Sequence, residues 1–479
     1  MPLSLRLPVF AVLLLAGCAE PPPPSAEPTP TAAEPAAEPF PLRIADGLRI
    51  ELVAAEPHVQ SPVALAWDAA GRMIAVEMPD YPVGPAGGRV KLLLDRDGDG
   101  SIDGHVVLAD GLAFPSSAAP VRGGLLVSAA PDVLFLSHTD RPGKPEVVLT
   151  GFAEANQQYR LNGLRYGLDN WVHGSGGGSG GRVRRPGEES AVTLGPNDFR
   201  FRPDGSGFEP AAGSSQFGFA FDAWGRRYTC TNSDHVRRVA VAARYLSRNP
   251  AAGVPAEAGV ADHGSEVFPA GAVAPLLHDP AAAGRITSAC GLHVYLGDAL
   301  PSLRGDLLVC EPAHGLVHRD RLVPDGPLVR AVRVHEGTEF LASADPAFRP
   351  VNLHTGPDGA LYVVDFRRNV IEHPKWVPPD KQQGLDFRAG ADRGRIWRIT
   401  PVGWTRPAVP DLSAMPSAGL VGELSHPNGW RRLTAQRLLV ERAGRDAVPA
   451  LRRLARTGAG PLGRLHALRT LEGLGALDA

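Results

Sequence analysis

Short hydrophobic runs separated by turn residues recur along most of the chain, a pattern typical of β-strands rather than of long helices. One phrase returns several times: an apolar residue, an Asp, small residues and a Gly precede a run rich in β-branched and aromatic residues. It is clearest at residues 67–72, 221–226 and 357–364. In such a phrase the Asp side chain bonds the backbone and the Gly adopts a positive φ, so each copy predicts a tight turn that leads into a strand.

Further copies of this phrase lie at residues 168–172 and, more loosely, at 123–127 and 305–309. The six copies follow one another at separations of 46–55 residues, except for one separation of 83. A propeller blade takes about 40–50 residues. The pattern therefore predicts an all-β fold, a six-bladed β-propeller over residues 41–402, with an insertion at about 247–284. A β-sandwich or two stacked β domains are alternatives that the even spacing disfavours.

After Pro401 the apolar residues recur at helical spacing. Asn428 is a candidate N-cap for a helix over residues 429–442, and Asp446 is a candidate cap for another. The start of this segment resembles a HEAT-type repeat. We therefore expect a short C-terminal α-helical, HEAT-like segment over residues 411–479.

The N-terminal residues have the layout of an export signal. Residues 1–17 carry one Arg, a short apolar run and small residues, and Cys18 follows directly. This arrangement resembles a bacterial lipobox, in which the peptidase cuts before the Cys and the Cys then carries lipid. Residues 18–40 are rich in Pro and form a tether that cannot bury a core. We expect an exported protein, lipid-anchored to the cell envelope at its periplasmic or outer surface; an ordinary signal peptide with a chance Cys is the alternative.

Composition narrows the function classes. The chain contains 55 Gly and 47 Pro, which suits many turns. Its 49 Lys and Arg balance 51 Asp and Glu, and no basic block stands out, so no nucleic-acid partner is expected. The glycine cluster at residues 174–181 lacks the ending of a phosphate loop. A nucleophile elbow and a covalent haem motif are also missing, which disfavours a serine hydrolase and a haem carried on this chain.

The sharpest local motif is an acidic loop. Its carboxylates alternate along the chain and a Gly allows the sharp turn, which is the pattern of a calcium loop. The flanking sequence is strand-like and the last position lacks the usual Glu, so we expect a weak structural calcium site between two strands, with a metal-free hairpin turn as the alternative. The expected ligands are Asp95, Asp97, Asp99, Ser101 and Asp103.

Three cysteines follow Cys18 in the chain. Export makes a disulfide plausible. We expect a bridge between Cys290 and Cys310 on neighbouring strands, with Cys230 free. Three buried thiols are the alternative.

Several phrases together resemble the membrane-bound dehydrogenase family of planctomycetes, verrucomicrobia and related bacteria, whose propeller is similar to the glucose/sorbosone dehydrogenase domain. The phrases lie at residues 160–169, 230–235, 288–292, 310–314, 348–352, 371–374 and 388–396. The resemblance implies pyrroloquinoline quinone and calcium as cofactors and oxidation of a sugar or alcohol hydroxyl. Since the haem domain that often follows in the family is missing, the electrons would pass to a separate acceptor such as a cytochrome.

The resemblance also implies site residues. The position of the catalytic base falls at Arg160, with Asn162 beside it. An arginine stays charged and is a poor base, so His173 and His235 are the candidate substitutes.

For the cofactor, Arg349 is the expected anion anchor, and Asp365 and Arg367 are expected at the same mouth of the propeller. The second hypothesis is a propeller without chemistry that binds a glycan or a protein partner. A lactonase-type hydrolase is a third, since similar propellers host that activity as well.

Overall fold

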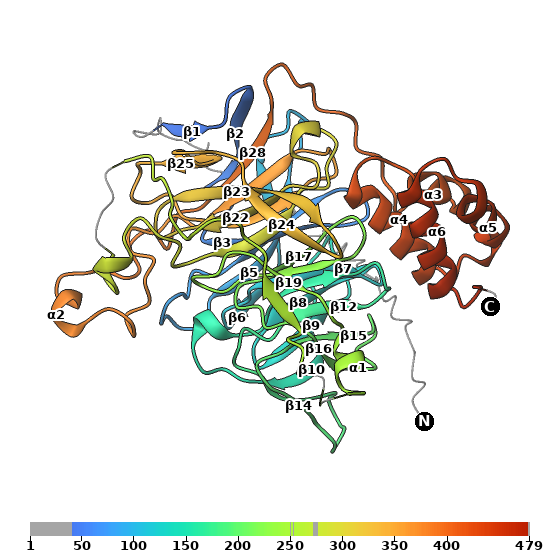
Figure 1. The fold of residues 1–479 in the computed structure, drawn as a ribbon, viewed down its shortest axis with the longest axis horizontal. Helices are drawn as coiled ribbons and strands as arrows, with labels where there is room; N and C mark the ends of the chain where they lie inside the picture. The colour runs from blue at the N-terminus through green and yellow to red at the C-terminus, as the bar shows by residue number, and fades with distance from the viewer. Residues whose placement is uncertain (1–40, 250, 252, 272–275, 478–479) are drawn as a thin grey trace, which may run out of the picture. The chain divides into compact units, whose positions relative to one another are not determined.

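Six antiparallel sheets make up most of the computed structural model, which describes residues 41–477 except 250, 252 and 272–275 (Figure 1). The expected signal segment, Cys18 and the tether lie outside the described residues. Each sheet is one blade of a six-bladed β-propeller, as the repeat predicts. In blades 1 to 4 the innermost strand comes first in the chain and each later strand pairs outside the one before it, whereas the outermost strands of blades 5 and 6 come from the N-terminal residues.

The first three blades use strands that follow one another almost directly in the chain. They are β3 (Pro62–Trp67), β4 (Met73–Glu77), β5 (Gly88–Leu94) and β6 (Gly104–Leu112) in blade 1; β7 (Ser117–Val121), β8 (Gly124–Ala129), β9 (Asp132–Leu136) and β10 (Glu146–Phe152) in blade 2; and β11 (Asn162–Tyr166), β12 (Val172–Ser175), β15 (Asp198–Phe201) and β16 (Glu209–Ala211) in blade 3. A hairpin of β13 (Gly181–Arg184) and β14 (Val192–Leu194) extends blade 2 outward.

The last three blades have longer connections. They are β17 (Phe219–Phe221), β18 (Arg227–Thr229), β19 (Arg237–Val239) and β20 (Glu257–Gly259) in blade 4; β21 (Cys290–Val294), β22 (Leu307–Glu311), β23 (Leu316–Asp325) and β25 (Leu341–Ser343) in blade 5, where β24 (Leu328–Arg333) also pairs with β23; and β26 (Pro350–Thr355), β27 (Leu361–Asp365), β28 (Arg395–Pro401) and β2 (Leu48–Ala55) in blade 6. The expected insertion at 247–284 therefore includes the outer strand of blade 4.

All six copies of the repeated phrase lie between the first and second strands of a blade. In blade 1, Asp68 accepts hydrogen bonds from the backbone of Ala70 and Arg72. Asp222 and Asp358 form the matching turns in blades 4 and 6. Local turn chemistry thus sets the repeat, because the Asp satisfies backbone N–H groups that a tight turn leaves unpaired.

The N-terminal strands close the propeller. β2 is the outermost strand of blade 6 and pairs with β28. β1 (Leu42–Ile44) pairs with β25 and becomes the outermost strand of blade 5. The N-terminal strands therefore complete two blades whose inner strands come late in the chain, and this pairing closes the ring of blades.

The C-terminal segment is helical, with α3 (Ser417–Glu423), α4 (Gly429–Glu441), α5 (Val448–Thr457) and α6 (Pro461–Gly473). Asn428 caps α4 as predicted, since its side chain accepts from the Trp430 N–H at 2.8 Å. The prediction for Asp446 is wrong. This residue lies inside a 3₁₀ turn, Arg445–Ala447, and accepts from the Ser417 hydroxyl instead.

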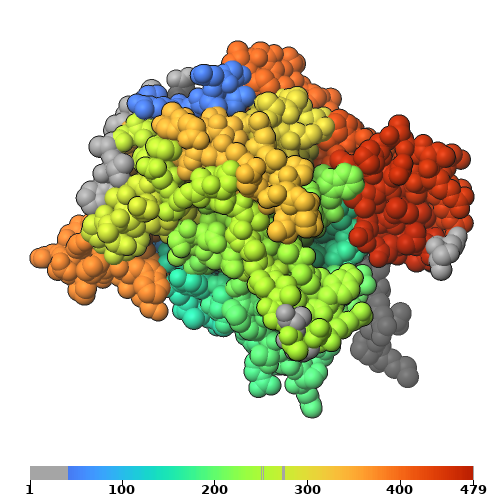
Figure 2. Space-filling model, viewed as in Figure 1, coloured from blue at the N-terminus to red at the C-terminus, as the bar shows by residue number. Residues whose placement is uncertain are grey.

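The helices contact the turns between first and second strands. Asn428 donates to the carbonyls of Gly356 and Pro357, and Gln436 donates to that of Leu168. On the face shown in Figure 2, the residues of the helices, in red, adjoin those of the sheets. Among the described residues, no helix has both the length and the apolar character that crossing a membrane requires.

Candidate active site in the axial cavity

A cavity of about 500 Å³ opens where the inner strands of the six blades begin. Each blade contributes to its wall through the start of its inner strand or the residue just before it: Val63, Ser116, Asn162, Gly218, Cys290 and Asn352. Three further segments, 157–161, 287–288 and 371–376, complete the wall. Its volume is in the range of small-molecule sites, about 300–1,000 Å³.

Three basic side chains lie near one another on the inner strands of blades 3, 5 and 6. Arg165 lies three residues beyond Asn162 on β11 and lines the cavity. His293 on β21 and His354 on β26 lie close enough for the charge of Arg165 to act on both. Burial and then this charge hold the pKa of both imidazoles well below the usual range, so both rings are neutral.

Arg165 has no acidic partner among the described residues, and it is half-buried in the cavity wall. Within the described part of the chain no hydrogen bond or ion pair involves its guanidinium, and desolvation alone lowers its pKa to about 10. His354 is already engaged, because its Nε2 accepts from the Leu65 N–H at 3.2 Å. A desolvated charge is normally paired, since loss of hydration opposes it. This position therefore favours an anionic group of a ligand.

The wall above Arg165 is largely aromatic. Tyr81 packs edge-on against Phe366, with ring centroids 5.7 Å apart, and Trp376 packs against Tyr159 at 6.4 Å. The Tyr81 hydroxyl donates to the Ile371 carbonyl and accepts from Gln158. Such a wall suits a flat organic ligand or the face of a sugar ring.

An imidazole and a carboxylate meet in the same wall. His278 Nδ1 lies 4.0 Å from Glu372 Oε1, which also accepts from the Leu277 N–H at 3.2 Å. Burial opposes ionisation of Glu372, but the His278 contact, backbone N–H groups and Arg349 outweigh it and lower its pKa to about 2. Glu372 is therefore an anion that lies beside His278 without a hydrogen bond to it, and a carboxylate in this place favours proton uptake by the imidazole.

Arg160 and Asn162, the first two predicted catalytic residues, do line the cavity. Arg160 lies over the Phe114 ring and donates to the Glu154 carbonyl, and its Nε has no partner. The side chain of Asn162 is engaged in structural hydrogen bonds, since it donates to two backbone carbonyls and accepts from the Gly218 N–H. Gly177 makes room behind this loop, because a Cβ there would lie 2.3 Å from the Arg160 carbonyl oxygen.

His173 and His235, the two candidate substitutes for the base, lie outside the cavity wall. His173 Nε2 contacts both oxygens of Asp169, at 3.0 and 3.1 Å, and its ring packs against Phe221. His235 contacts Asp320 between blades 4 and 5. Neither imidazole is placed to meet a ligand in the cavity.

The three predicted cofactor ligands also lie behind the wall rather than in it. Arg349 donates to four backbone carbonyls, which engages four of its five N–H groups. Asp365 is fully buried and accepts from the backbone of Arg349 and Arg367. Arg367 pairs with Asp345 at 3.0 Å. Together these residues hold the segment that carries Phe366 into the cavity.

The acidic loop joins β5 and β6, and none of its residues lines the cavity. Ligand atoms of Asp95, Asp97 and Asp99 lie within 4.8 Å of one another, so they can converge on a cation. Arg406 already contacts Asp95 Oδ2 at 2.7 Å. In the cavity itself Glu372 is the one carboxylate among the described lining residues, so a calcium ion there would take most of its oxygen ligands from amide side chains, backbone carbonyls or a bound ligand.

Cys290 and Cys310 are direct partners in the pairing of β21 with β22. Both are free thiols, so the expected disulfide is not formed in this structure, and Cys230 is free as expected. Burial raises the pKa of the Cys290 and Cys310 thiols well above the usual range. They stay protonated and unreactive, since the thiolate is the reactive form.

A family model, the domain of unknown function DUF7133, matches residues 35–403 of the chain. A search of curated proteins finds no match.

Several solved structures are similar in fold. A glucose dehydrogenase-type oxidoreductase from Thermus thermophilus is 19% identical with a TM-score of 0.46, and covers 74% of this chain and 100% of its own. The aldose sugar dehydrogenase of Streptomyces coelicolor, solved with pyrroloquinoline quinone bound, is 13% identical with a TM-score of 0.39, covering 74% and 100%. The soluble aldose sugar dehydrogenase of Escherichia coli is 13% identical with a TM-score of 0.41, covering 74% and 99%. At these scores the likeness carries no argument about activity.

Proposed function

The chain belongs to the DUF7133 family, and we propose that it is an envelope-anchored dehydrogenase that oxidises a sugar or alcohol hydroxyl with a carboxylate-bearing quinone in the axial cavity. The observation that carries the proposal is Arg165, a desolvated guanidinium without a partner among the described residues. A carboxylate supplies the missing charge, and the aromatic wall packs against a flat ring system. Arg160, whose Nε is also without a partner, can hold a second carboxylate.

The chemistry of the bound group is hydride acceptance. His278 would take the hydroxyl proton at Nε2, and the Glu372 carboxylate, 4.0 Å from Nδ1, would stabilise the charge that the ring then gains. Tyr81 and Phe366 exclude water from the inner part of the cavity. The electrons then leave to a separate acceptor, a cytochrome in the simplest case. Lipidation at Cys18 would keep the protein at the membrane where such acceptors lie.

The first test is a calorimetric titration of the full-length chain with pyrroloquinoline quinone. We expect saturable binding at one site, weakened by about 30-fold or more in Arg165→Met, because a charge pair of this kind contributes roughly 2–5 kcal/mol. Arg182→Met changes an exposed arginine and is the matched control. His278→Gln should bind the quinone normally but fail to reduce a dye with any of a panel of sugars and alcohols. Absence of binding in the wild type would overturn the proposal.

A propeller that binds a glycan without redox chemistry is the second candidate. It is favoured by Trp376, which is 45% exposed on the cavity wall and whose indole N–H donates to Gln158. Indole and amide groups of this kind recognise sugar rings. Binding of oligosaccharides that survives Arg165→Met but is lost in Trp376→Ala would support this candidate instead.

A further inference from the structure

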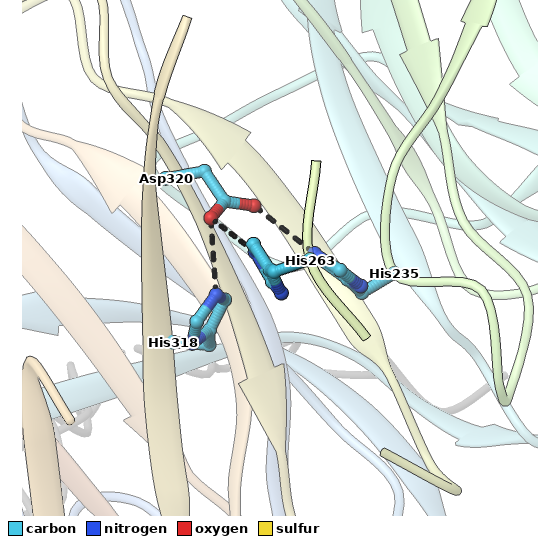
Figure 3. A group of neighbouring side chains, drawn as sticks. All are labelled: His235, His263, His318 and Asp320. Carbon is cyan, nitrogen blue, oxygen red and sulfur yellow. Dashed lines mark hydrogen bonds and ion pairs between the residues drawn. The ribbon is translucent and has the colours of Figure 1, made fainter. Parts of the chain in front are cut away.

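A second cluster of side chains lies outside the cavity, between blades 4 and 5. His235 stands just before β19, His263 lies in the connection after β20, and β23 supplies His318 and Asp320 (Figure 3). Residues 318 and 320 are two apart on a strand, so their side chains lie on one face of the sheet. None of the four is among the described residues that line the cavity.

The three imidazoles converge on one carboxylate. His263 and His318 direct Nε2 at Asp320 Oδ1, at 2.9 and 3.1 Å, and His235 directs Nε2 at Oδ2, at 3.0 Å. The ring centroids form a nearly equilateral triangle with sides of 5.0, 5.2 and 5.3 Å. The ligand atoms of all four residues lie within 4.8 Å of one another.

The outer nitrogens of two of these rings fix where their protons lie. His318 Nδ1 is 2.8 Å from Glu339 Oε2, and His263 Nδ1 is 2.8 Å from the Gly264 carbonyl. A carboxylate and a carbonyl can only accept, so they place a proton on each Nδ1. With Nδ1 engaged on the outer side, Nε2 of each ring is the atom directed at Asp320, which is the arrangement that metal-bound imidazoles have.

One divalent cation can be shared by the three imidazoles and Asp320, because their ligand atoms all lie within 4.8 Å of one another. Imidazoles whose Nδ1 atoms are held by a carboxylate or a carbonyl are the usual ligands of such metals.

We propose that His235, His263, His318 and Asp320 bind one divalent transition metal, with zinc as the best match. Three nitrogens and one carboxylate oxygen suit a tetrahedral zinc ion, whereas calcium and magnesium prefer sites made of oxygen. His235, His318 and Asp320 are buried and the His263 side chain is 14% exposed. With four protein ligands and little solvent access, the site is closed and structural.

The metal would add to the contacts that hold the connection after β20, among them the backbone N–H of Phe268 on Glu339 and that of Leu277 on Glu372. The connection after β20 has two isolated backbone bridges, Ala261 to Ala331 and Glu266 to Arg285, and this same connection carries His278 into the cavity. Through His263 the metal ties the connection to blades 4 and 5. It thereby positions His278 without touching the ligand.

The test is metal analysis of the full-length chain, purified, exposed to zinc and dialysed. We expect about one zinc per chain, and replacement by cobalt should give the intense visible absorption of a four-coordinate site. His263→Gln should fall below about 0.1 equivalent under the same conditions. His138→Gln, which alters a histidine outside the cluster, should keep the full equivalent.

Measurements on the wild-type protein alone can decide the test, even if a variant of the cluster fails to fold. A folded wild type that retains no zinc, shows no cobalt absorption and keeps its thermal midpoint in a strong chelator would overturn the proposal. Metal that persists in His263→Gln but is lost in Asp97→Asn would assign it to the acidic loop, and would also overturn the proposal.

Discussion

The cavity and the cluster between blades 4 and 5 both gather desolvated basic side chains, but they differ in how their charge is balanced. In the cavity Arg165 has no acid beside it. In the cluster Asp320 contacts three imidazoles, and Glu339 contacts one of them from outside. An unbalanced desolvated charge favours binding of a ligand of opposite charge, whereas a cluster whose charges balance stabilises the folded state. The cavity is therefore suited to binding and releasing a ligand, and the cluster to holding the fold together.

The strongest way to break this comparison is Asp320→Asn. The substitution removes the negative charge that the buried imidazoles share, so we expect the free energy of unfolding to fall by about 3–5 kcal/mol. Urea denaturation of the zinc-loaded chain measures it. Asp325→Asn changes an exposed carboxylate on the same strand and should stay within about 0.5 kcal/mol. A loss below about 1 kcal/mol for Asp320→Asn would contradict the assigned role.

The pH dependence of the free energy of unfolding tests the charge of Glu372 in the cavity. The pKa of Glu372 is about 2 in the folded chain, below its ordinary value of 4.5. A lowered folded pKa gives stability that is present above 4.5 and is lost as the pH falls toward 2. We expect this carboxylate to contribute about 2–3 kcal/mol to that loss.

Glu372→Gln should therefore flatten the stability curve between pH 4.5 and 2, as followed by urea denaturation at each pH. The exposed Glu154→Gln serves as the control and should leave the curve unchanged. An equal slope in Glu372→Gln and in the wild type would mean that Glu372 is not held as an anion.

Arg165→Met should move stability in the opposite direction from Asp320→Asn. Without added ligand, removal of an uncompensated desolvated charge should raise the free energy of unfolding by about 1–2 kcal/mol. The same change should abolish the stabilisation that a bound carboxylate ligand provides. Urea denaturation with and without ligand gives both values. A destabilised variant in the absence of ligand would show that Arg165 serves the fold rather than the site.

The acidic loop gives the smallest expected effect. At calcium concentrations about tenfold above its dissociation constant, binding adds roughly 1.4 kcal/mol to stability. Asp97→Asn should remove this gain, measured as the calcium-dependent shift of the thermal midpoint. The zinc content of the cluster should not change. A calcium shift that survives in Asp97→Asn would place the calcium elsewhere.

Features set by neighbouring residues could be predicted from the sequence. The side chains of Asp68, Asp222 and Asp358 accept hydrogen bonds from the backbone N–H two residues further along the chain. Asn428 does the same at the start of α4. The failure at Asp446 has the same origin, because the partner that it found, Ser417, lies 29 residues away.

The sites could not be predicted in this way, because the inner strands of all six blades build the cavity. Arg165 has no local signal that separates it from other arginines, and the interaction between His278 and Glu372 spans most of two blades. His235 was expected to be catalytic, but its partners come from two other segments. His318 lies on a strand, so its neighbours along the chain cannot form a helical zinc motif, and only the fold brings His263 beside it.

The closure of the propeller by β1 and β2 has a mechanical consequence. A force applied at the N-terminus reaches β1 first, which is paired with β25 at three positions. β2 is paired with β28 at seven positions, and loading begins there only after β1 has detached. The shorter strand thus acts as a sacrificial link: it can peel away and return while the longer one keeps the ring of blades, and the cavity at its centre, intact under load.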